Sequence, residues 1–152
     1  MAITVGDTSG ETASLTPDLW RVDPRDLDFA WPMVASFVSR VINRTGQLTL
    51  SSVHKMVSAG EMQMWVAMPG PKVEAVALTE MIDYPAARIF RVGHLAGDGM
   101  ERWLVGLDQM EKWAAEQGCT RAQVIGRKGW ERALNGYHHA HVILEKELSN
   151  GV

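Results

Sequence analysis

Apolar residues recur at intervals of three and four between positions 27 and 42, and this spacing predicts an amphipathic helix. Pro32 lies inside the stripe, so we expect either a kink at the proline or a helix that starts near it. Gly46 is the expected end of this helix. The stripe consists of Leu27, Ala30, Trp31, Val34, Phe37, Val38, Val41 and Ile42.

A second helix is predicted over residues 50–59, with Thr49 as its N-cap and Gly60 as its C-cap. The pattern then changes to short apolar runs separated by turns at Pro69-Gly70-Pro71 and Asp83-Tyr84-Pro85. Three strands with such short connections form an antiparallel meander. The expected strands are MQMWVAM (62–68), Val73–Met81 and Arg88–Val92.

The last third of the chain alternates between helix and strand. Residues 99–118 have one apolar and one charged side, which predicts a helix, and Cys119–Ile125 is an apolar run that predicts a buried strand. A strand, a crossover helix and a further strand imply a parallel pair, so the sheet is mixed. A short helix over Trp130–Asn135 and a final strand over Ala140–Leu148 complete the pattern.

The predicted fold class is therefore α/β, with three layers around a mixed, mostly antiparallel sheet flanked by helices. Residues 1–16 are polar and rich in Gly, Ser and Thr, which predicts a flexible arm. Residues 17–152 are expected to form one domain. Leu19–Val22 is the only candidate for a strand that precedes the first helix.

Composition and charge exclude several classes of protein. The chain has 152 residues, of which 46% are hydrophobic and 22% charged, as in an ordinary globular domain. A net charge of −3 gives no general reason to expect nucleic-acid binding. No run approaches the length of a membrane span, and no signal peptide is visible at the N-terminus. We therefore expect a cytoplasmic protein without a membrane partner. The single cysteine, Cys119, excludes an internal disulfide, and a buried thiol is favoured over a nucleophile.

A glycine-containing segment, His94-Leu95-Ala96-Gly97-Asp98-Gly99, joins the third meander strand to the long helix. The N-terminus of a helix carries unpaired N–H groups and the positive end of the helix dipole, so such a segment can receive a phosphate. Together with the later sequences GWERALNGY and HVILEKEL, it resembles the core of the GNAT family of acetyl-CoA-dependent N-acetyltransferases.

The resemblance implies the GNAT fold and acetyl-CoA (coenzyme A) as cofactor. The family's pyrophosphate signature begins with Gln or Arg, and His94 stands at that position here. The strand that ends at Val92 would line the pantetheine. Arg127 is one of several arginines that could contact phosphates, with a local basic patch as the alternative. The residues that the resemblance assigns to the cofactor are Val92, Gly93, Gly97, Asp98, Gly99, Met100, Arg127 and Asn135.

The resemblance also directs attention to an acid and a base. Gly136-Tyr137 matches a second family signature, but Arg132 stands where the family's acidic tyrosine is usual. Tyr137 is the substitute candidate, with ordinary packing as the alternative. Glu80 and His94 are candidate bases for the substrate amine, with a solvated strand residue and a loop histidine as the alternatives.

Three histidines close to the C-terminus, His138, His139 and His141, invite a metal interpretation. His139 and His141 would share one face of a strand, and Glu145 continues that face, but no third ligand lies nearby in sequence. A polar strand surface is therefore favoured, and no metal site is predicted.

Two functions remain open. The first is transfer of acetyl from acetyl-CoA to an unknown amine on a small molecule or a protein. The second rests on Gly118-Cys119 and Gly126-Arg127-Lys128-Gly129-Trp130, which resemble GNAT-like proteins of bacteriophages. It is a catalytically silent structural or interaction protein, located in the virion, with phage structural proteins or its own copies as partners. An enzyme predicts an open splay between the two parallel strands, whereas a structural protein predicts that Trp or Met side chains fill it.

Overall fold

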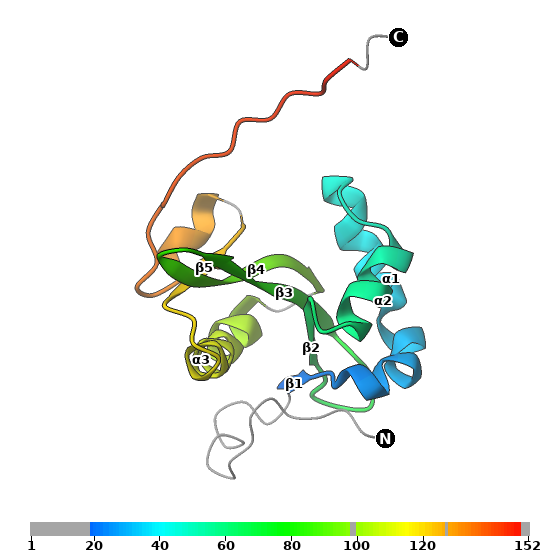
Figure 1. The fold of residues 1–152 in the computed structure, drawn as a ribbon. Coiled ribbons are helices and arrows are strands. Elements are labelled where there is room, and N and C mark those ends of the chain that lie inside the picture. The colour runs from blue at the N-terminus through cyan, green and yellow to red at the C-terminus, as the bar shows by residue number, and fades with distance from the viewer. Residues whose placement is uncertain (1–18, 98–99, 127, 150–152) are drawn as a thin grey trace.

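The computed structural model describes residues 19–97, 100–126 and 128–149. Its five-stranded sheet has the order β1-β2-β3-β4-β5, and all neighbours are antiparallel except the parallel pair β4 and β5. Helices α1 and α2 cover one face of the sheet and α3 the other (Figure 1). This mixed α/β fold agrees with the prediction. The strands are β1 (Leu19–Arg21), β2 (Gln63–Ala67), β3 (Ala75–Tyr84), β4 (Ala87–Gly97) and β5 (Arg121–Val124).

The residues that begin and end α1 and α2 match the extent of their apolar stripes, so both helices form where the sequence predicts them. A short 3₁₀ helix, η2 (Pro24–Asp26), leads into α1 (Leu27–Thr45), which runs through Pro32 rather than starting near it. Gly46 ends α1 in the left-handed conformation, with φ of 65°. Thr49 and Ser52 form a capping box at the start of α2 (Leu50–Ser58). Ala59, one residue before the predicted Gly60, is the C-cap.

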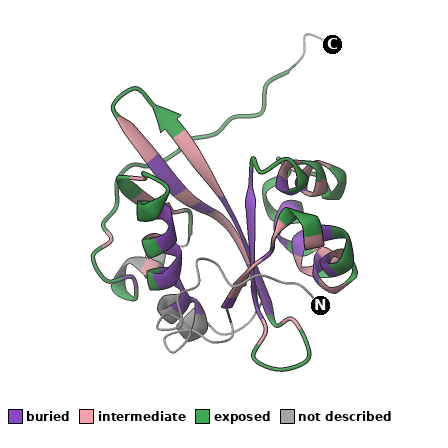
Figure 2. Cartoon of the chain, turned by 60° about the horizontal axis from the view of Figure 1, so that its bottom comes forward, coloured by how far each residue is buried: buried purple, intermediate pink, exposed green. Residues whose placement is uncertain are grey.

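The opposite face is covered by α3 (Met100–Glu116) and the 3₁₀ helix η3 (Lys128–Arg132). Trp103, Leu107, Met110 and Trp113 of α3 are buried against alternate residues of the sheet. The side chains of β2 and β3 alternate between the two apolar clusters, so Leu78 faces α1 and Ala77 faces α3. The sheet therefore has a buried layer on both sides (Figure 2).

Strand β4 is longer than predicted. It continues to Gly97 instead of ending at Val92, because residues 94–97 pair with Leu78 to Ala75 of β3. Leu95 packs towards α3 and Ala96 towards α1, so both faces of this extension are covered. The segment interpreted as a glycine loop is thus mostly strand, and Asp98 and Gly99 lie outside the described residues.

Two predictions about the C-terminal third are wrong. Strand β5 is shorter than Cys119–Ile125 and only half-buried, because it is the last strand of the described sheet. Residues 138–149 form no strand, although Ala140–Leu148 has a strand-like pattern. They extend away from the domain (Figure 1), and their side chains are largely exposed. A strand needs a partner edge for its backbone groups, and no strand in the described part of the chain pairs with this segment.

Candidate functional site

A β-bulge in β4 opens the sheet beside β5. Val92 pairs with Thr79 and His94 with Leu78, so Gly93 is an extra residue without a partner on β3. Such a bulge bends the strand that contains it. Pairing between β4 and β5 covers only Ile89 to Val92, and Ile125 makes the last contact through its N–H to the Val92 carbonyl at 3.0 Å. From Gly93 to Gly97, the β4 edge that faces β5 has no strand partner within the described residues.

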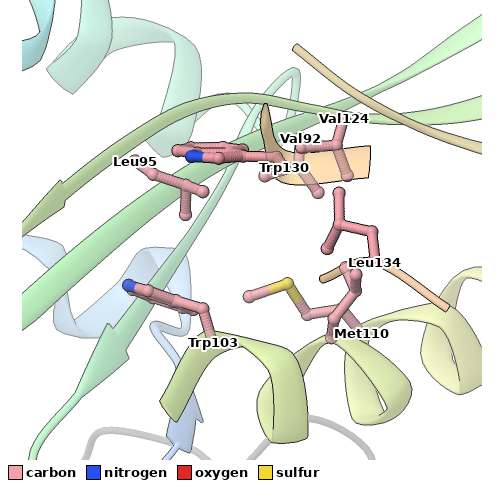
Figure 3. A pocket seen from close by; sticks show the side chains of 8 residues that line it. Val92, Leu95, Trp103, Met110, Val124, Trp130 and Leu134 are labelled. Carbon is pink, nitrogen blue, oxygen red and sulfur yellow. The ribbon is translucent and has the colours of Figure 1, made fainter. Parts of the chain in front are cut away.

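An apolar pocket lies where the two strands separate. Its empty volume is about 300 Å³, including space open to solvent. Trp103 and Met110 rise from α3 on one side, and Trp130 lies beside Val92 on the other (Figure 3). The lining residues are Val92, Leu95, Trp103, Leu107, Met110, Val124, Trp130 and Leu134. All eight side chains are hydrophobic, and the indole N–H groups of Trp103 and Trp130 are the polar atoms among them, so the pocket suits apolar groups.

The absence of a side chain at Gly126 leaves room for Trp130 in this pocket. A β-carbon at Gly126 would overlap the six-membered ring of the Trp130 indole, so the indole rests directly on the glycine backbone. The splay expected of an enzyme is present, and the Trp and Met side chains expected of a structural protein line it. Sequence reasoning missed the whole lining except Val92. The Gly126–Trp130 pair in GRKGW was the signal that could have found it.

The two candidate bases lie on the other face of the sheet. Leu78 packs against α1, and His94 is directly opposite Leu78, so His94 also points to the α1 side. Glu80 occupies the same face, two residues along β3 from Leu78. Burial lowers the pKa of His94, while the charge of Glu80 opposes that shift. A neutral imidazole can accept a proton, so this shift is compatible with the role of base predicted for His94.

The hydroxyl of Tyr137, the candidate acid, is engaged by a glutamate of α3. It packs against the α3 cluster, and its hydroxyl donates a hydrogen bond to Oε2 of Glu111 at 2.5 Å. Burial raises the pKa of Tyr137 far above its usual value, and the hydrogen bond to Glu111 and the charges of Glu111 and Asp108 add to the shift. A phenol with a raised pKa holds its proton more firmly, so it is a weaker acid for a leaving thiolate.

Replacing Tyr137 by phenylalanine is therefore expected to lower the free energy of unfolding by about 1 kcal/mol, the usual net value of one hydrogen bond. Urea unfolding measures this change, and Tyr84→Phe, at a half-exposed tyrosine, is the control. If Tyr137→Phe were as stable as Tyr84→Phe, the hydrogen bond to Glu111 would not stabilise the fold.

Among the described residues, Val92 is the one predicted cofactor residue that lines the pocket. Gly97 ends β4 with φ of 115°, and a β-carbon there would collide with the Glu74 carbonyl oxygen. Its close packing on β3 explains the glycine without any ligand. The backbone of Met100 begins α3, and Asn135 is exposed in the turn after η3. Asp98, Gly99 and Arg127 lie outside the described residues.

The structure also shows the surroundings of the single cysteine and of the three C-terminal histidines. Cys119 is half-buried, and burial raises the pKa of its thiol, which disfavours the nucleophilic thiolate. His138, His139 and His141 lie in the exposed C-terminal segment. Within the described ranges, no group of three His, Cys, Asp or Glu side chains could hold a metal ion. None of the described helices is long and apolar enough to cross a membrane.

Comparison with solved structures identifies the fold. An aminoglycoside acetyltransferase from an uncultured soil metagenomic sample, in complex with sisomicin, superimposes with a TM-score of 0.65 at 12% identity, over 86% of this chain and 95% of that one. A predicted acetyltransferase from Clostridium acetobutylicum, solved with acetyl-CoA, gives 0.62 at 14% identity, over 85% and 94% of the two chains.

A third structure, an integron cassette protein from the mobile metagenome of Cole Harbour Salt Marsh, gives a TM-score of 0.65 at 14% identity, over 89% of this chain and 93% of that one. No protein-family model and no curated protein matches the sequence. At these identities the likeness concerns the backbone alone. The bulged β4, the splayed β5 and the helical layers on both faces are together the GNAT fold.

Proposed function

We propose that this chain is an N-acetyltransferase that binds acetyl-CoA at the splay between β4 and β5 and acetylates an amine. The observation that carries the proposal is the β4 edge from Gly93 to Gly97, which no described strand pairs with on the β5 side, beside an apolar pocket. Pantetheine is a narrow chain with two amide groups, which suits free backbone donors and acceptors next to hydrophobic walls. One neighbour of the same fold was solved with acetyl-CoA.

In this proposal, one group of residues around the bulge binds the cofactor and another accepts the proton of the substrate amine. Val92, Leu95 and Val124 bind the apolar parts of the cofactor, and acetyl-CoA supplies the acetyl thioester when it is bound. His94 or Glu80, on the far side of the sheet, would take the proton that the amine loses, directly or through a water molecule, as the amine nitrogen bonds to the acetyl carbon and the C–S bond breaks to release coenzyme A. The substrate amine would approach the bulge from the α1 side, where these two side chains lie.

The proposal predicts that filling the pocket prevents cofactor binding. Val124→Phe places a larger side chain in the pocket wall, and we expect it to weaken acetyl-CoA binding about tenfold or more, or about 1.4 kcal/mol. Isothermal titration calorimetry measures the change. Ile125→Phe is the matched control, because Ile125 is the next residue, is exposed and alternates to the other face.

Leu95→Phe repeats the test from the β4 side of the pocket, in case Val124→Phe does not fold. A folded wild-type protein without detectable acetyl-CoA binding would contradict the proposal, as would equal affinities for Val124→Phe and Ile125→Phe. Gly97→Glu is unsuitable for this purpose, because its side chain would collide with the backbone of β3 whether or not a phosphate binds there.

A non-catalytic interaction role is the second candidate. The exposed apolar C-terminal segment favours it, since hydrophobic residues gathered in solvent commonly mark a contact surface. A virion location and the bacteriophage relationship rest only on the sequence likeness of GRKGW and its neighbours. Absence of acetyl-CoA binding would make this candidate the leading one.

A further inference from the structure

On the α1 side of the sheet, a row of polar side chains lies beyond the apolar layer under the helices. Leu78 is the last residue of β3 in the apolar cluster around α1, and the β3–β4 hairpin extends past α1 and α2 (Figure 2). Glu80 of β3, Arg91 of β4 and Gln123 of β5 follow on this face, directly opposite one another in the sheet register. All three side chains are half-buried, so a ligand can reach the row from solvent.

Arg91 and Glu80 carry opposite charges but do not form an ion pair. Opposite charges on facing strand positions are close enough to attract each other, and these two residues are register partners on β4 and β3. Within the described part of the chain, however, Arg91 contacts no carboxylate. Its Nε and Nη2 instead donate hydrogen bonds to Oε1 of Gln123 at 3.1 and 2.9 Å. Gln123 is uncharged, so it directs the guanidinium towards β5 without neutralising it.

The bonds to Gln123 leave part of the guanidinium of Arg91 available. They use the N–H of Nε and one N–H of Nη2. The second N–H of Nη2 and the two of Nη1 have no partner among the described residues. A guanidinium presents its donors as a planar fork, which matches the two oxygens of a carboxylate and binds them more strongly than neutral groups. Arg91 is therefore a positioned cation with an open edge for an anion.

The two candidate bases lie on the same face as this cation. The charge of Glu80 acts on His94, whereas the guanidinium of Arg91 is directed away from both, towards β5. Arg91 and His94 are three residues apart on β4, or about 10 Å at about 3.3 Å per residue of extended strand, and the bulge at Gly93 shortens this distance. A molecule that contacts both ends of this site therefore has its amine and its anionic group several bonds apart.

We propose that Arg91 binds a carboxylate of the acceptor substrate, and that the acceptor is an amino acid whose amine and carboxylate are separated by several carbons. The inference rests on the proposed function, because it takes the amine at the bulge to be the group that is acetylated. One guanidinium matches the single charge of a carboxylate. An α-amino acid, in which one carbon joins the two groups, is too short to contact both ends of the site.

A series of ω-amino acids tests both the charge and the spacing. Glycine, β-alanine, γ-aminobutyrate, δ-aminovalerate and ε-aminocaproate are each assayed with acetyl-CoA by the release of the coenzyme A thiol, beside the same compounds as uncharged primary amides. We expect the lowest KM for acids longer than β-alanine, and a KM at least tenfold higher for their amides. Equal KM values for acids and amides would overturn the proposal, as would a lowest KM for glycine or turnover of none of the acids.

Arg91→Gln removes the charge from the row. We expect the KM of the preferred acid to rise tenfold or more with kcat little changed, because the lost contact binds substrate and transition state alike. The KM of its amide should stay the same. Arg121→Gln is the matched control, because Arg121 is exposed on the same face of β5 but lies opposite Ile89, farther from the bulge. Equal effects of the two variants would contradict a specific carboxylate site.

Calorimetry with acetyl-CoA separates this inference from the proposed function. Wild-type protein and Arg91→Gln should bind acetyl-CoA with the same affinity, since Arg91 is on the opposite face from the pocket. If acetyl-CoA binds but acids and amides are acetylated equally, the carboxylate site is wrong and the acetyltransferase proposal stands. If the folded wild-type protein does not bind acetyl-CoA, both proposals fail. Should Arg91→Gln not fold, the comparison of acids with amides on the wild-type protein still decides.

Discussion

Replacing Gly97 by alanine is expected to lower the free energy of unfolding by about 3 kcal/mol or more, because two costs of about 1–3 kcal/mol each add in this variant. The φ of 115° lies in a region that side chains rarely adopt, and holding alanine there strains the backbone. The new β-carbon would also collide with the Glu74 carbonyl oxygen and lie 2.6 Å from the Ala75 Cα. Overpacking against backbone is costly because the strand itself has to shift.

Urea unfolding followed by far-UV circular dichroism measures this loss. Gly70→Ala is the matched control, because Gly70 has an ordinary φ and a β-carbon added there would meet no atom within 4 Å. It should change the free energy of unfolding by about 0.5 kcal/mol or less. If Gly97→Ala were as mild as Gly70→Ala, the close approach of β4 to β3 at this point would be wrong.

Replacing Trp65 by alanine is expected to cost about 3–5 kcal/mol of stability, the range for large aromatic residues in a core. Trp65 is completely buried in β2. Its ring packs edge-on against Trp113 with centroids 5.5 Å apart, so it joins the sheet to α3. Its indole N–H donates to the Thr79 hydroxyl at 3.0 Å, and that hydroxyl donates to Gln63 at 2.9 Å.

Trp65→Phe separates the packing of the ring from its hydrogen bond, because phenylalanine keeps most of the apolar contact but cannot donate to Thr79. We expect it to cost less than the alanine variant. Phe29→Ala is the surface control, since Phe29 is 60% exposed and its loss should change stability by about 0.5 kcal/mol or less. Thermal or urea unfolding by far-UV circular dichroism compares all three. A Trp65→Ala variant as stable as Phe29→Ala would show that this core is not as described.

The structure changes the interpretation of Gly97, which precedes the long helix. From the sequence, Gly97 and Gly99 are equivalent members of a phosphate-binding signature. In the structure Gly97 already has a packing reason, because β4 crosses close to the start of β3. A loss of acetyl-CoA binding in a Gly97 variant would therefore report folding as much as phosphate recognition. Val124 and Leu95 test the pocket without that ambiguity.

The helices and the order of the strands were predictable because their signals are local. The apolar stripe of α1, the Thr49 cap of α2 and the glycine after α1 act through neighbours a few residues away. The crossover helix also dictates a parallel β4–β5 pair, since a short return is impossible. These features require no knowledge of distant contacts.

Where β4 ends, and whether residues 140–148 form a strand, depend on residues that are distant in sequence. Residues 94–97 become strand because β3 lies beside them and both faces are covered, although the glycines resemble a loop. Residues 140–148 have the alternation of a strand, but no strand of the described chain pairs with them. Alternation describes two faces, and only an available neighbour supplies the hydrogen bonds.

The candidate bases, Glu80 on one strand and His94 at the end of the next, and the family-like glycine signature were predicted from the sequence and stay predictions. The location of the candidate site depended on contacts between distant parts of the chain. The bulge at Gly93 separates β4 from β5, Trp103 and Trp130 line one pocket although they are far apart in sequence, and Tyr137 is bound to Glu111. A pocket is a property of surfaces that folding brings together, so its walls cannot be predicted from the spacing of residues along one element.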